Sequence, residues 1–420
     1  MNLTPILSNL PTPNPRRIAL RLIPAAEYAV RQGHPWVFDN SIREQSHPGK
    51  SGDLAVIFDE KRRFLAIGLY DPDSPIRVRV LQFREPSAIN QDWFKNRLTS
   101  AVRLRLPLLD QPADRLTSGY RLVHGENDGL PGLVVDRYAQ TLVLKLYTLA
   151  WIPHLNDVCT SLMQVSPAEG LILRFSRAVL KQSQSFSGLG DGLVLCGSSA
   201  PGPILFQENG LVFEADPILG QKTGFFLDQR DNRVRVERLS RGKSVLNVFS
   251  YTGGFSVYAA RGGARQVTSV DISVPAMQAS IRNMAHNQHM PAVAAAKHET
   301  IAEDAFEVLQ RMRKENRHFD LVIIDPPMFA QNQSQVAAAL NAYQRLTRLG
   351  LVALSPNGIL VQASCSSRVD ADSFFSAIHR AARESNRHLI EIERSGHALD
   401  HPIGFPEGAY LKCLFARVAG

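Results

Sequence analysis

The sequence lacks any apolar run near the ~20 residues that a membrane-spanning helix needs. Its start, MNLTPILSNLPTPNPRR, lacks the layout of a secretory signal, and its prolines predict a flexible tail over residues 1–17. Cysteine is scarce, and the four cysteines have unrelated spacings, which argues against a disulfide framework and against a zinc site. These absences favour a cytoplasmic protein without a membrane segment or a metal.

Two nucleotide-binding motifs are also absent: the glycine pattern G-x-G-x-x-G and the phosphate loop G-x-x-x-x-G-K-[ST]. Residues 244–271 nevertheless read as strand, glycine turn, helix, strand and acid. The turn contains Gly253 and Gly254, and the second strand ends in Asp271, which is 17 residues after Gly254. Glycine lets the backbone approach a ligand, and an acid at a strand end suits two ribose hydroxyls. The pattern predicts a unit that binds an adenosine-type cofactor.

A second apolar run, FDLVIIDPPMF (residues 319–329), ends in Asp325, Pro326 and Pro327. Proline has no N–H, so the pair ends the strand at its carboxyl edge, where open α/β sheets bind ligands. The segment is similar to motif IV of class I S-adenosylmethionine-dependent methyltransferases.

A third run, GILVQASCSSRVD (residues 358–370), delivers Cys365 to the same edge of the predicted sheet. The other cysteines, Cys159, Cys196 and Cys413, lie in helical or strand patterns and are predicted to be structural. A thiolate at this edge has a use, because its addition to carbon 6 of a pyrimidine makes carbon 5 nucleophilic enough to accept a methyl group.

These segments, together with GHPWVFDNSI, HGENDGLPGLVVDRYA, GQKTGFFLDQRDNR and HPIGFPEGAYLKC, resemble the ribosomal RNA large subunit methyltransferase I family. The resemblance runs from about Ile18 to Val418. It implies methylation of carbon 5 of a cytidine in 23S ribosomal RNA, with S-adenosylmethionine as cofactor. Met328 stands where the family usually has a lysine after the two prolines.

The expected fold class is α/β, with a doubly wound, Rossmann-like class I methyltransferase domain at the C-terminus (residues 198–420). Alternating strands and helices predict this parallel sheet, and the last two runs, HLIEIER and AYLKCLFARV, predict an antiparallel end pair. Short alternating runs over residues 18–85 predict a β-rich module, which the resemblance makes an RNA-binding PUA domain. Residues 89–197 predict a small α+β domain of the order strand, strand, helix, strand, strand. Asp228 and Asp370 are expected to cap helices.

The resemblance also implies a role for each site residue. Cys365 is the expected nucleophile, and Asp325 is expected to hydrogen-bond the cytosine ring, because protonation of nitrogen 3 makes carbon 6 more electrophilic. Asp271 is expected to bind the ribose and Asp304 to lie near the adenine, although Asp304 also suits a helix N-cap. The full set expected to bind the cofactor is Lys222, Thr223, Gln229, Phe249, Ser250, Tyr251, Thr252, Gly253, Gly254, Asp271, Ile272, Asp304, Ala305, Asp325 and Pro326.

The charge balance suits a polyanionic partner, because 47 Lys and Arg face 39 Asp and Glu, a formal +8. Candidate RNA contacts are His34, Trp36, Arg62, Arg77 and Arg79, of which Arg77 and Arg79 share one face of a strand. The alternative for His34 and Trp36 is a packed turn, and for Arg62 a solvated hairpin tip. A homodimer is compatible with the sequence.

Two other functions stay open from the residues. A methyltransferase of a purine exocyclic amine would also use an acidic-Pro-Pro segment, but it would not need Cys365. A non-catalytic RNA-binding assembly factor could retain the cofactor fold. The acids Glu126, Asp128 and Asp136 are interpreted as caps of a glycine-proline loop rather than as metal ligands, because no suitably spaced histidine accompanies them.

Overall fold

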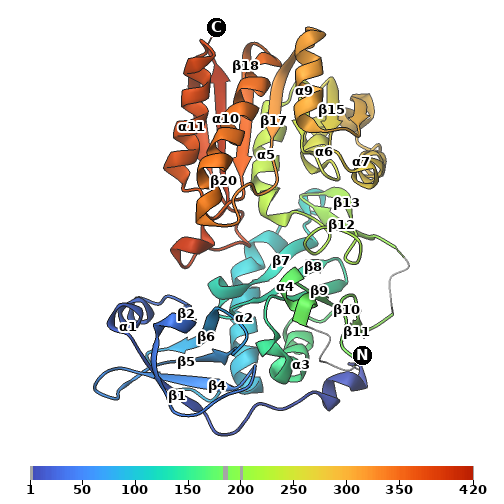
Figure 1. The fold of residues 1–420 in the computed structure, drawn as a ribbon. Helices are drawn as coiled ribbons and strands as arrows, with labels where there is room; N and C mark the ends of the chain where they lie inside the picture. Colours follow the sequence, from blue (N-terminus) through green and yellow to red (C-terminus); the bar gives the residue numbers. More distant parts are fainter. Residues whose placement is uncertain (1–2, 183–187, 199–201, 420) are drawn as a thin grey trace. The chain divides into compact units, whose positions relative to one another are not determined.

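The computed structural model describes residues 3–182, 188–198 and 202–419, and its chain divides into two compact units (Figure 1). Unit 1 contains the residues up to Gln207 together with Ala215–Phe225 and Leu399–Gly408. Unit 2 contains Glu208–Glu214, Phe226–Ala398 and the residues from Ala409 onward. Within the described ranges, no helix is both long enough and apolar enough to cross a membrane.

Unit 1 begins with a six-stranded sheet, in the order β2-β6-β5-β4-β1-β3, which confirms the predicted β-rich module. Burial alternates along β1, whereas consecutive residues are buried in β4, β5 and the middle of β6, so both faces of the sheet are covered there. The elements are β1 (Ile18–Leu22), α1 (Pro24–Arg31), β2 (Trp36–Phe38), β3 (Ile42–Gln45), β4 (Leu54–Phe58), β5 (Phe64–Tyr70) and β6 (Ile76–Phe83).

A second sheet of unit 1 has five strands in the order β11-β10-β9-β8-β7. The predicted strand order was wrong in one respect: the run GLVVDRYAQTLVLKLY forms two strands, because the chain reverses at Ala139, which has a left-handed φ of 50°. The elements are α2 (Gln91–Leu109), β7 (Gly119–His124), β8 (Leu133–Tyr138), β9 (Thr141–Leu146), α3 (Leu155–Val165), β10 (Gly170–Phe175), α4 (Arg177–Gln182) and β11 (Val194–Cys196).

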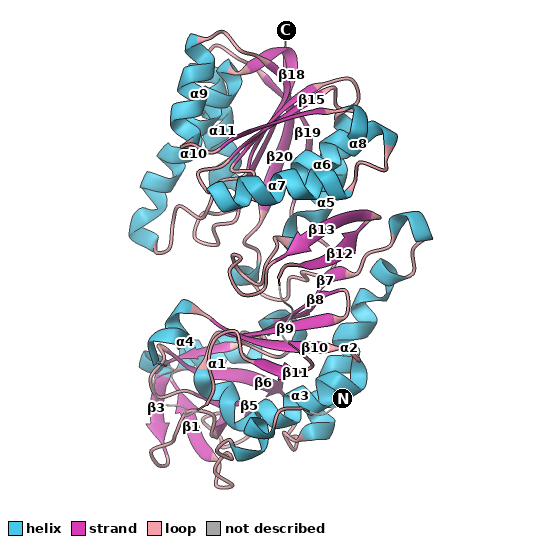
Figure 2. Ribbon diagram, turned by 90° about the vertical axis from the view of Figure 1, so that its right-hand side faces the viewer, coloured by secondary structure: helices cyan, strands magenta, loops and turns pink. Residues whose placement is uncertain are grey.

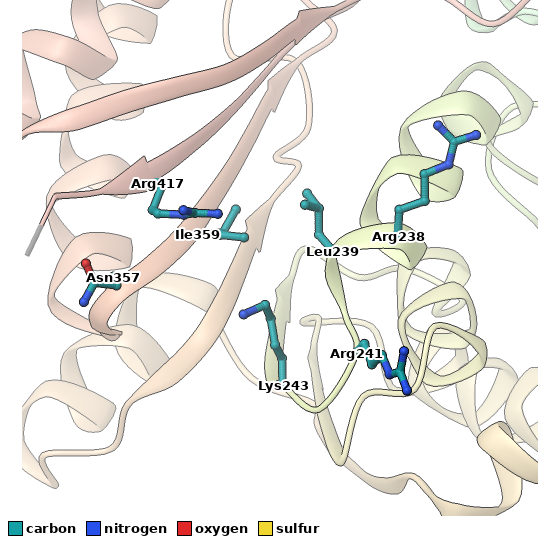
Figure 3. A pocket seen from close by; sticks show the side chains of 7 residues that line it. All are labelled: Arg238, Leu239, Arg241, Lys243, Asn357, Ile359 and Arg417. Carbon is teal, nitrogen blue, oxygen red and sulfur yellow. The ribbon is translucent and has the colours of Figure 1, made fainter.

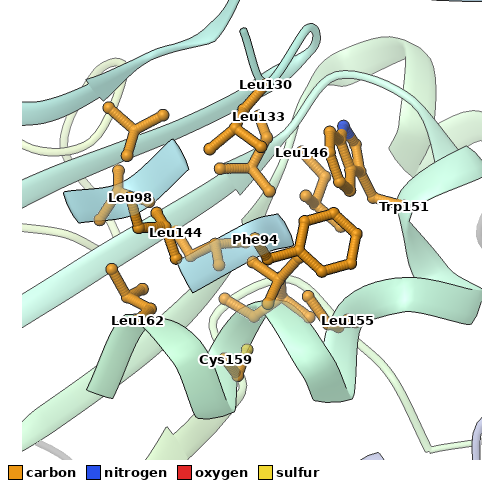
Figure 4. Packing of buried hydrophobic residues seen from close by; sticks show 14 of the residues in the cluster. Phe94, Leu98, Leu130, Leu133, Leu144, Leu146, Trp151, Leu155, Cys159 and Leu162 are labelled. Carbon is orange, nitrogen blue, oxygen red and sulfur yellow. The ribbon is translucent and has the colours of Figure 1, made fainter. Parts of the chain in front are cut away.

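One hydrophobic core joins the two sheets of unit 1. Figure 4 shows the part of this core that lies between α2, α3 and the second sheet. Leu54 and Ile67 from the first sheet pack in the same cluster as Phe94 and Leu144 from the central part. The flexible tail predicted for residues 1–17 is not observed over its described part, because Leu7 is buried in this core. In addition, the Thr4 N–H donates to the carbonyl of Leu195 (2.8 Å) and the Asn14 N–H to Asp53 (3.0 Å).

The acids of the glycine-proline loop are held by cations and a ring N–H. Asp128 forms two hydrogen bonds with the buried Arg105 guanidinium, both 2.7 Å, and Asp136 pairs in the same way with Arg121. Glu126 accepts from the indole N–H of Trp36 (2.9 Å). Buried charges are tolerated when paired in this way, so these carboxylates stabilise unit 1.

Unit 2 is built on a seven-stranded sheet in the order β16-β15-β14-β17-β18-β20-β19. The strands from β16 to β18 pair in parallel, and β20 runs antiparallel to both of its neighbours, which confirms the predicted end pair. Before this sheet in the sequence, β12 (Ile204–Glu208) and β13 (Leu211–Ala215) form a two-stranded hairpin whose residues are divided between the two units. The sheet strands are β14 (Ser244–Val248), β15 (Gln266–Val270), β16 (Lys297–Ile301), β17 (Phe319–Ile324), β18 (Leu354–Ser364), β19 (Leu389–Ser395) and β20 (Lys412–Val418).

Helices cover both faces of this sheet, as Figure 2 shows: α9, α10 and α11 lie on one face and α5, α6, α7 and α8 on the other. Asp370 caps α11, as predicted, by accepting from the Ser373 N–H (2.8 Å). The cap predicted for Asp228 was wrong, because a 3-10 turn precedes α5 and Asp228 instead accepts from the Tyr410 hydroxyl (2.9 Å). The helices are α5 (Arg230–Leu239), α6 (Gly254–Arg261), α7 (Val274–His286), α8 (Pro291–Ala295), α9 (Ala305–Lys314), α10 (Val336–Val352) and α11 (Ala371–Glu384).

We predict that Glu208→Ala destabilises unit 2 by about 3–5 kcal/mol, because it leaves the Arg233 guanidinium buried without its carboxylate. In the native protein, Glu208 accepts two hydrogen bonds from Arg233 (2.8 and 2.6 Å) and one from Tyr258 (3.0 Å), and all three residues are buried. Urea unfolding measures the loss. The control is Glu384→Ala, which removes an exposed pair with Arg348 and should cost at most about 1 kcal/mol. Equal losses for the two variants would contradict the prediction.

Candidate active site

The turn after β14 has an unusual backbone. Phe249, Tyr251 and Gly253 all have left-handed φ angles, of 61°, 46° and 79°. A Cβ on Gly253 would lie 2.2 Å from the Ser280 hydroxyl, so only glycine fits there. Non-glycine residues in this region store strain of about 1–3 kcal/mol each, and such strain gathers at ligand sites. The turn that the sequence singled out is therefore a strained turn at the carboxyl edge of the sheet.

Asp271 stands at the end of β15, beside this turn. Its Oδ2 accepts from the Tyr251 N–H (2.9 Å) and its Oδ1 from the Ser273 N–H (2.9 Å). A carboxylate offers about four lone-pair positions, so each oxygen keeps one position for a further donor such as a ribose hydroxyl. The two backbone bonds fix the direction of the carboxylate before any ligand binds.

Two hydroxyls of the same turn lack partners. The side-chain oxygens of Ser250 and Thr252 are buried, and neither has a hydrogen-bond partner among the described residues. Unpaired buried hydroxyls are rare in native structures because each costs about 1–3 kcal/mol. A polar group bound against this turn would offer them partners, which fits the amino-acid part of S-adenosylmethionine. Gly254 follows them as the first residue of α6.

The remaining predicted cofactor residues of unit 2 lie around the same sheet edge. Asp304 caps α9 through the N–H groups of Phe306 (2.9 Å) and Glu307 (3.2 Å), and Ala305 behind it is buried. The Ile272 side chain, next to Asp271, is 71% exposed, which leaves an apolar surface open to an adenine ring. Gln229 is buried and accepts from Asn232 (2.6 Å), so it is already engaged within α5 and the turn before it.

Lys222 and Thr223 lie in unit 1, whereas the other predicted cofactor residues lie in unit 2. Thr223 is buried and hydrogen-bonds Asp136 and the Tyr138 hydroxyl (3.1 Å to the latter). The carbonyl of Lys222 accepts from the Lys145 ammonium (2.8 Å). Their contact with the cofactor therefore stays a prediction.

Asp325 and Cys365 leave neighbouring strands at the same edge, β17 and β18. The loops that follow them are joined by a hydrogen bond from the Ser366 hydroxyl to the Ala330 carbonyl (3.1 Å). Tyr343 of α10 lies close to both: burial raises the pKa of its phenol, and negative charge on Cys365 and Asp325 raises it further. The structure thus brings the two predicted catalytic residues into one neighbourhood, with Pro326 buried beneath the exit of β17.

The four cysteines differ as expected. Cys159, Cys196 and Cys413 are buried, whereas Cys365 is only partly buried. Burial raises the pKa of the Cys159 and Cys413 thiols, which keeps them protonated and unreactive. Only Cys365 combines access to solvent with a place at the sheet edge.

Lys412 was missed by the sequence reasoning. It is a buried lysine in the otherwise apolar start of β20, and it pairs with Ser364 of β18, one residue before Cys365. The signal was present in the sequence as a lysine flanked by apolar residues near the start of the run AYLKCLFARV. Met328, at the family's lysine position, is 45% exposed beside the same edge.

The residues proposed to bind RNA have mixed surroundings within unit 1. Trp36 and His34 pack edge-on against Phe405, with ring centroids 5.1 and 6.0 Å away, so they form a packed cluster. Arg77 and Arg79 were predicted to contact RNA from one face of a strand. This prediction is wrong for Arg79, which is 6% exposed and lies 3.7 Å from Asp71. The burial follows from packing of β6, whose central residues face both sides of a covered sheet.

Arg77 is half-buried and donates to the carbonyls of Asp71 and Pro72. Arg62 is exposed at the tip of the β4–β5 hairpin, where its φ is 61°. Of the three arginines proposed as RNA contacts, Arg62 is the one that is exposed.

A basic depression lies at the opposite, amino edge of the unit 2 sheet (Figure 3). Its volume is about 410 Å³, and cationic side chains from α5, the loop between α5 and β14, and the end of β20 surround it. The lining residues are Arg238, Leu239, Arg241, Lys243, Asn357, Ile359 and Arg417. It is separate from the carboxyl edge that holds Asp271 and Cys365, and it adds to the positive surface of unit 2.

Comparison with known proteins agrees with this geometry. A family model described as S-adenosylmethionine-dependent methyltransferase matches residues 142–417, and one described as a PUA-like domain matches residues 20–83. The chain is similar in fold to a Streptococcus mutans protein assigned as a SAM-dependent methyltransferase (TM-score 0.80, 23% identity, 95% of this chain and 100% of that one). It is equally similar to a protein assigned as a methyltransferase and solved with SAH (TM-score 0.80, 24% identity, 95% and 100% covered).

Relatives with higher identity extend over nearly the whole chain. A "Ribosomal RNA large subunit methyltransferase" from Deinococcus radiodurans is 47% identical over 97% of this chain and 99% of its own length. A "Ribosomal RNA large subunit methyltransferase I" from Photobacterium profundum is 38% identical over 94% and 98%, and one from Pseudoalteromonas translucida is 35% identical over 95% and 99%. The chain is therefore an S-adenosylmethionine-dependent methyltransferase that belongs to the ribosomal RNA large subunit methyltransferase I family.

Proposed function

We propose that this methyltransferase modifies carbon 5 of a cytidine in 23S ribosomal RNA, with Cys365 as the nucleophile. The observation that carries the proposal is the single accessible cysteine at the end of β18, next to the Asp325-Pro326-Pro327 exit of β17. Methylation of an exocyclic amine needs no such thiol. The names of the relatives support large-subunit ribosomal RNA as the substrate, and four cysteines outside disulfides suit a reducing cytoplasm.

S-adenosylmethionine supplies an electrophilic methyl group on its sulfonium. In our proposal, the Asp271 carboxylate accepts hydrogen bonds from both ribose hydroxyls, and the backbone from Ser250 to Gly254 passes beneath the amino-acid part. Asp304 and Ile272 border the adenine. The prearranged carboxylate and the unpaired hydroxyls of Ser250 and Thr252 support this assignment, because they favour a polar ligand at this turn. Phe249, Tyr251, Thr252 and Ala305 shape the same border.

We assign a less direct role in cofactor binding to Lys222, Thr223 and Gln229. They lie in the GQKTGFFLDQRDNR segment, which matches the family stretch that closes over the cofactor. Thr223 hydrogen-bonds Asp136, and Gln229 hydrogen-bonds Asn232. Because these side chains are engaged within the protein, we expect them to hold the backbone of this stretch in place.

The chemistry assigned to the side chains is as follows. The Cys365 thiolate adds to carbon 6 of cytosine and forms a C–S bond. The protonated Asp325 carboxyl donates a hydrogen bond to ring nitrogen 3, which draws the displaced electron pair toward that nitrogen. Carbon 5 then attacks the methyl group, the bond between that methyl group and the sulfonium sulfur breaks, and S-adenosylhomocysteine leaves. A base takes the carbon 5 proton, and the electron pair of that C–H bond restores the double bond and expels the Cys365 thiolate.

We predict that Asp271→Ala weakens S-adenosylmethionine binding at least about tenfold, since charge-assisted hydrogen bonds contribute about 1.5–3 kcal/mol. Isothermal titration calorimetry measures the affinity. Glu303→Ala is the control: Glu303 lies at the end of a neighbouring strand but pairs with the exposed Arg311. Full affinity in the Asp271 variant would remove this carboxylate from the cofactor site.

We predict that Cys365→Ala abolishes methyl transfer while S-adenosylmethionine binding and thermal unfolding stay close to native values. The loss of a partly exposed thiol at a strand end costs little stability. The matched control is Cys413→Ala on the neighbouring strand, which should retain activity because that thiol is buried within the sheet.

RNA containing 5-fluorocytidine extends the test of Cys365. Fluorine cannot leave as a proton, so the native enzyme should form a covalent complex that survives denaturing electrophoresis. Substantial methylation by the Cys365→Ala enzyme would contradict the carbon 5 route and favour methylation of an exocyclic amine.

We predict that affinity for ribosomal RNA fragments falls steeply as salt rises, because Lys and Arg release counterions from phosphates. Deletion of residues 1–85 would expose the shared core of unit 1, so a point variant is the better probe. Arg62→Glu should weaken binding and reduce the salt slope by about one. Arg348→Glu, on an exposed face of α10, is the control. An unchanged slope would remove the β4–β5 hairpin from the RNA surface.

A further inference from the structure

Lys412 is a buried lysine next to the proposed nucleophile, and the mechanism proposed above gives it no role. Lys412 is 5% exposed, and the antiparallel pairing of β20 with β18 sets it opposite Ser364. Cys365 is the next residue along β18. Burying an ammonium costs several kcal/mol, so its presence at this position calls for compensating contacts.

Those contacts all involve the turn that begins at Cys365. The Lys412 ammonium donates hydrogen bonds to the carbonyls of Ser366 and Val369, the latter at 2.5 Å. The same turn is held from its other side, where the Ser366 hydroxyl donates to Ala330 of the loop after β17. Lys412 therefore ties the nucleophile's turn to β20, and Ser366 ties it to the Asp325 loop.

The electrostatic surroundings connect the ammonium to the thiol. Burial lowers the pKa of Lys412 to about 8, and negative charge on Cys365 and Asp370 opposes this shift. Lys412 thus stays mainly protonated at neutral pH while lying within electrostatic reach of the Cys365 sulfur. A cation beside a cysteine favours the thiolate, which is the form that adds to carbon 6.

Arg368 is a second cation in the turn after Cys365, but its side chain is exposed, so solvent screens its charge more than that of the buried Lys412. Asp325 from the exit of β17 and Asp370 at the start of α11 are acids, and Tyr343 of α10 and Cys413 of β20 have raised pKa values that keep them neutral. The acids oppose a second negative charge nearby, which makes a compensating cation necessary for thiolate chemistry at this edge.

We propose that Lys412 is a positioning residue for the reaction: it fixes the turn of Cys365 through two carbonyls and stabilises the thiolate through its charge. The proposal rests on the proposed role of Cys365. It assigns no proton transfer to Lys412, and it predicts that removal of the charge and removal of the hydrogen bonds have separable effects.

The rate of iodoacetamide alkylation of the full-length native enzyme, followed against pH by peptide mass spectrometry, tests the charge directly. Cys365 can be read selectively because Cys159, Cys196 and Cys413 are buried. The Cys365 peptide should reach half its maximal rate at a lower pH in the folded enzyme than in the urea-unfolded chain. An equal or higher midpoint in the folded enzyme would overturn the proposal without any variant.

Lys412→Gln removes the charge and keeps an N–H donor, whereas Lys412→Arg keeps both. The Gln variant should alkylate about tenfold more slowly near neutral pH, because one pKa unit changes the thiolate fraction about tenfold. Its midpoint should rise, and the Arg variant should restore much of the native profile. S-adenosylmethionine affinity should stay native in both variants, which reports that unit 2 is folded.

An unchanged alkylation profile in a folded Lys412→Gln enzyme would contradict the proposal, even if methylation were lost. This outcome is distinct from failure of the proposed function, which is read from methylation by Cys365→Ala and does not depend on Lys412. A slower alkylation of Lys412→Gln together with an active Cys365→Ala enzyme would leave Lys412 as a thiolate stabiliser but refute its part in catalysis.

Discussion

Parallel pairing of four strands, β15, β14, β17 and β18, is the constraint on which the candidate site depends. Parallel strands all end at the same edge of a sheet, so four segments that are far apart in the sequence deliver their following residues to one place. These residues are the strained turn after β14, Asp271, Asp325 and Cys365. The antiparallel strand β20 enters from the opposite direction, and for this reason its first residue, Lys412, reaches that edge too.

Several cationic side chains are buried in this protein, and the groups that compensate their charges differ. Arg105, Arg121 and Arg233 each face a carboxylate in two-bond geometry, which satisfies both partners and leaves them inert. Lys412 instead bonds two carbonyls, so its charge is not neutralised by a bonded acid in those contacts. A buried cation held in this way can act on a neighbouring thiol.

The sequence allowed much of the fold and the site to be predicted, because the relevant signals are local. Apolar runs ending in Asp271 and Asp325 predicted strands and their exits, and the alternation of strands and helices predicted a parallel sheet with an antiparallel end pair. The roles of residues that depend on contacts with distant parts of the sequence were predicted less well. Asp228 looked like a helix cap, yet its carboxylate binds Tyr410, which is distant in sequence. Arg79 looked exposed from strand alternation, yet both faces of β6 are covered near its middle.

Lys412 was missed for the same reason, because its position beside Cys365 depends on the pairing of β20 with β18, which cannot be read from the run AYLKCLFARV alone.

Our central proposal is that the methyl group goes to carbon 5 of a cytidine. Nucleoside mass spectrometry of 23S ribosomal RNA, methylated in vitro with isotope-labelled S-adenosylmethionine and digested to nucleosides, tests this claim most directly. The account predicts that the label is in 5-methylcytidine. Label in a nucleoside methylated on an exocyclic amine, with none in 5-methylcytidine, would contradict it.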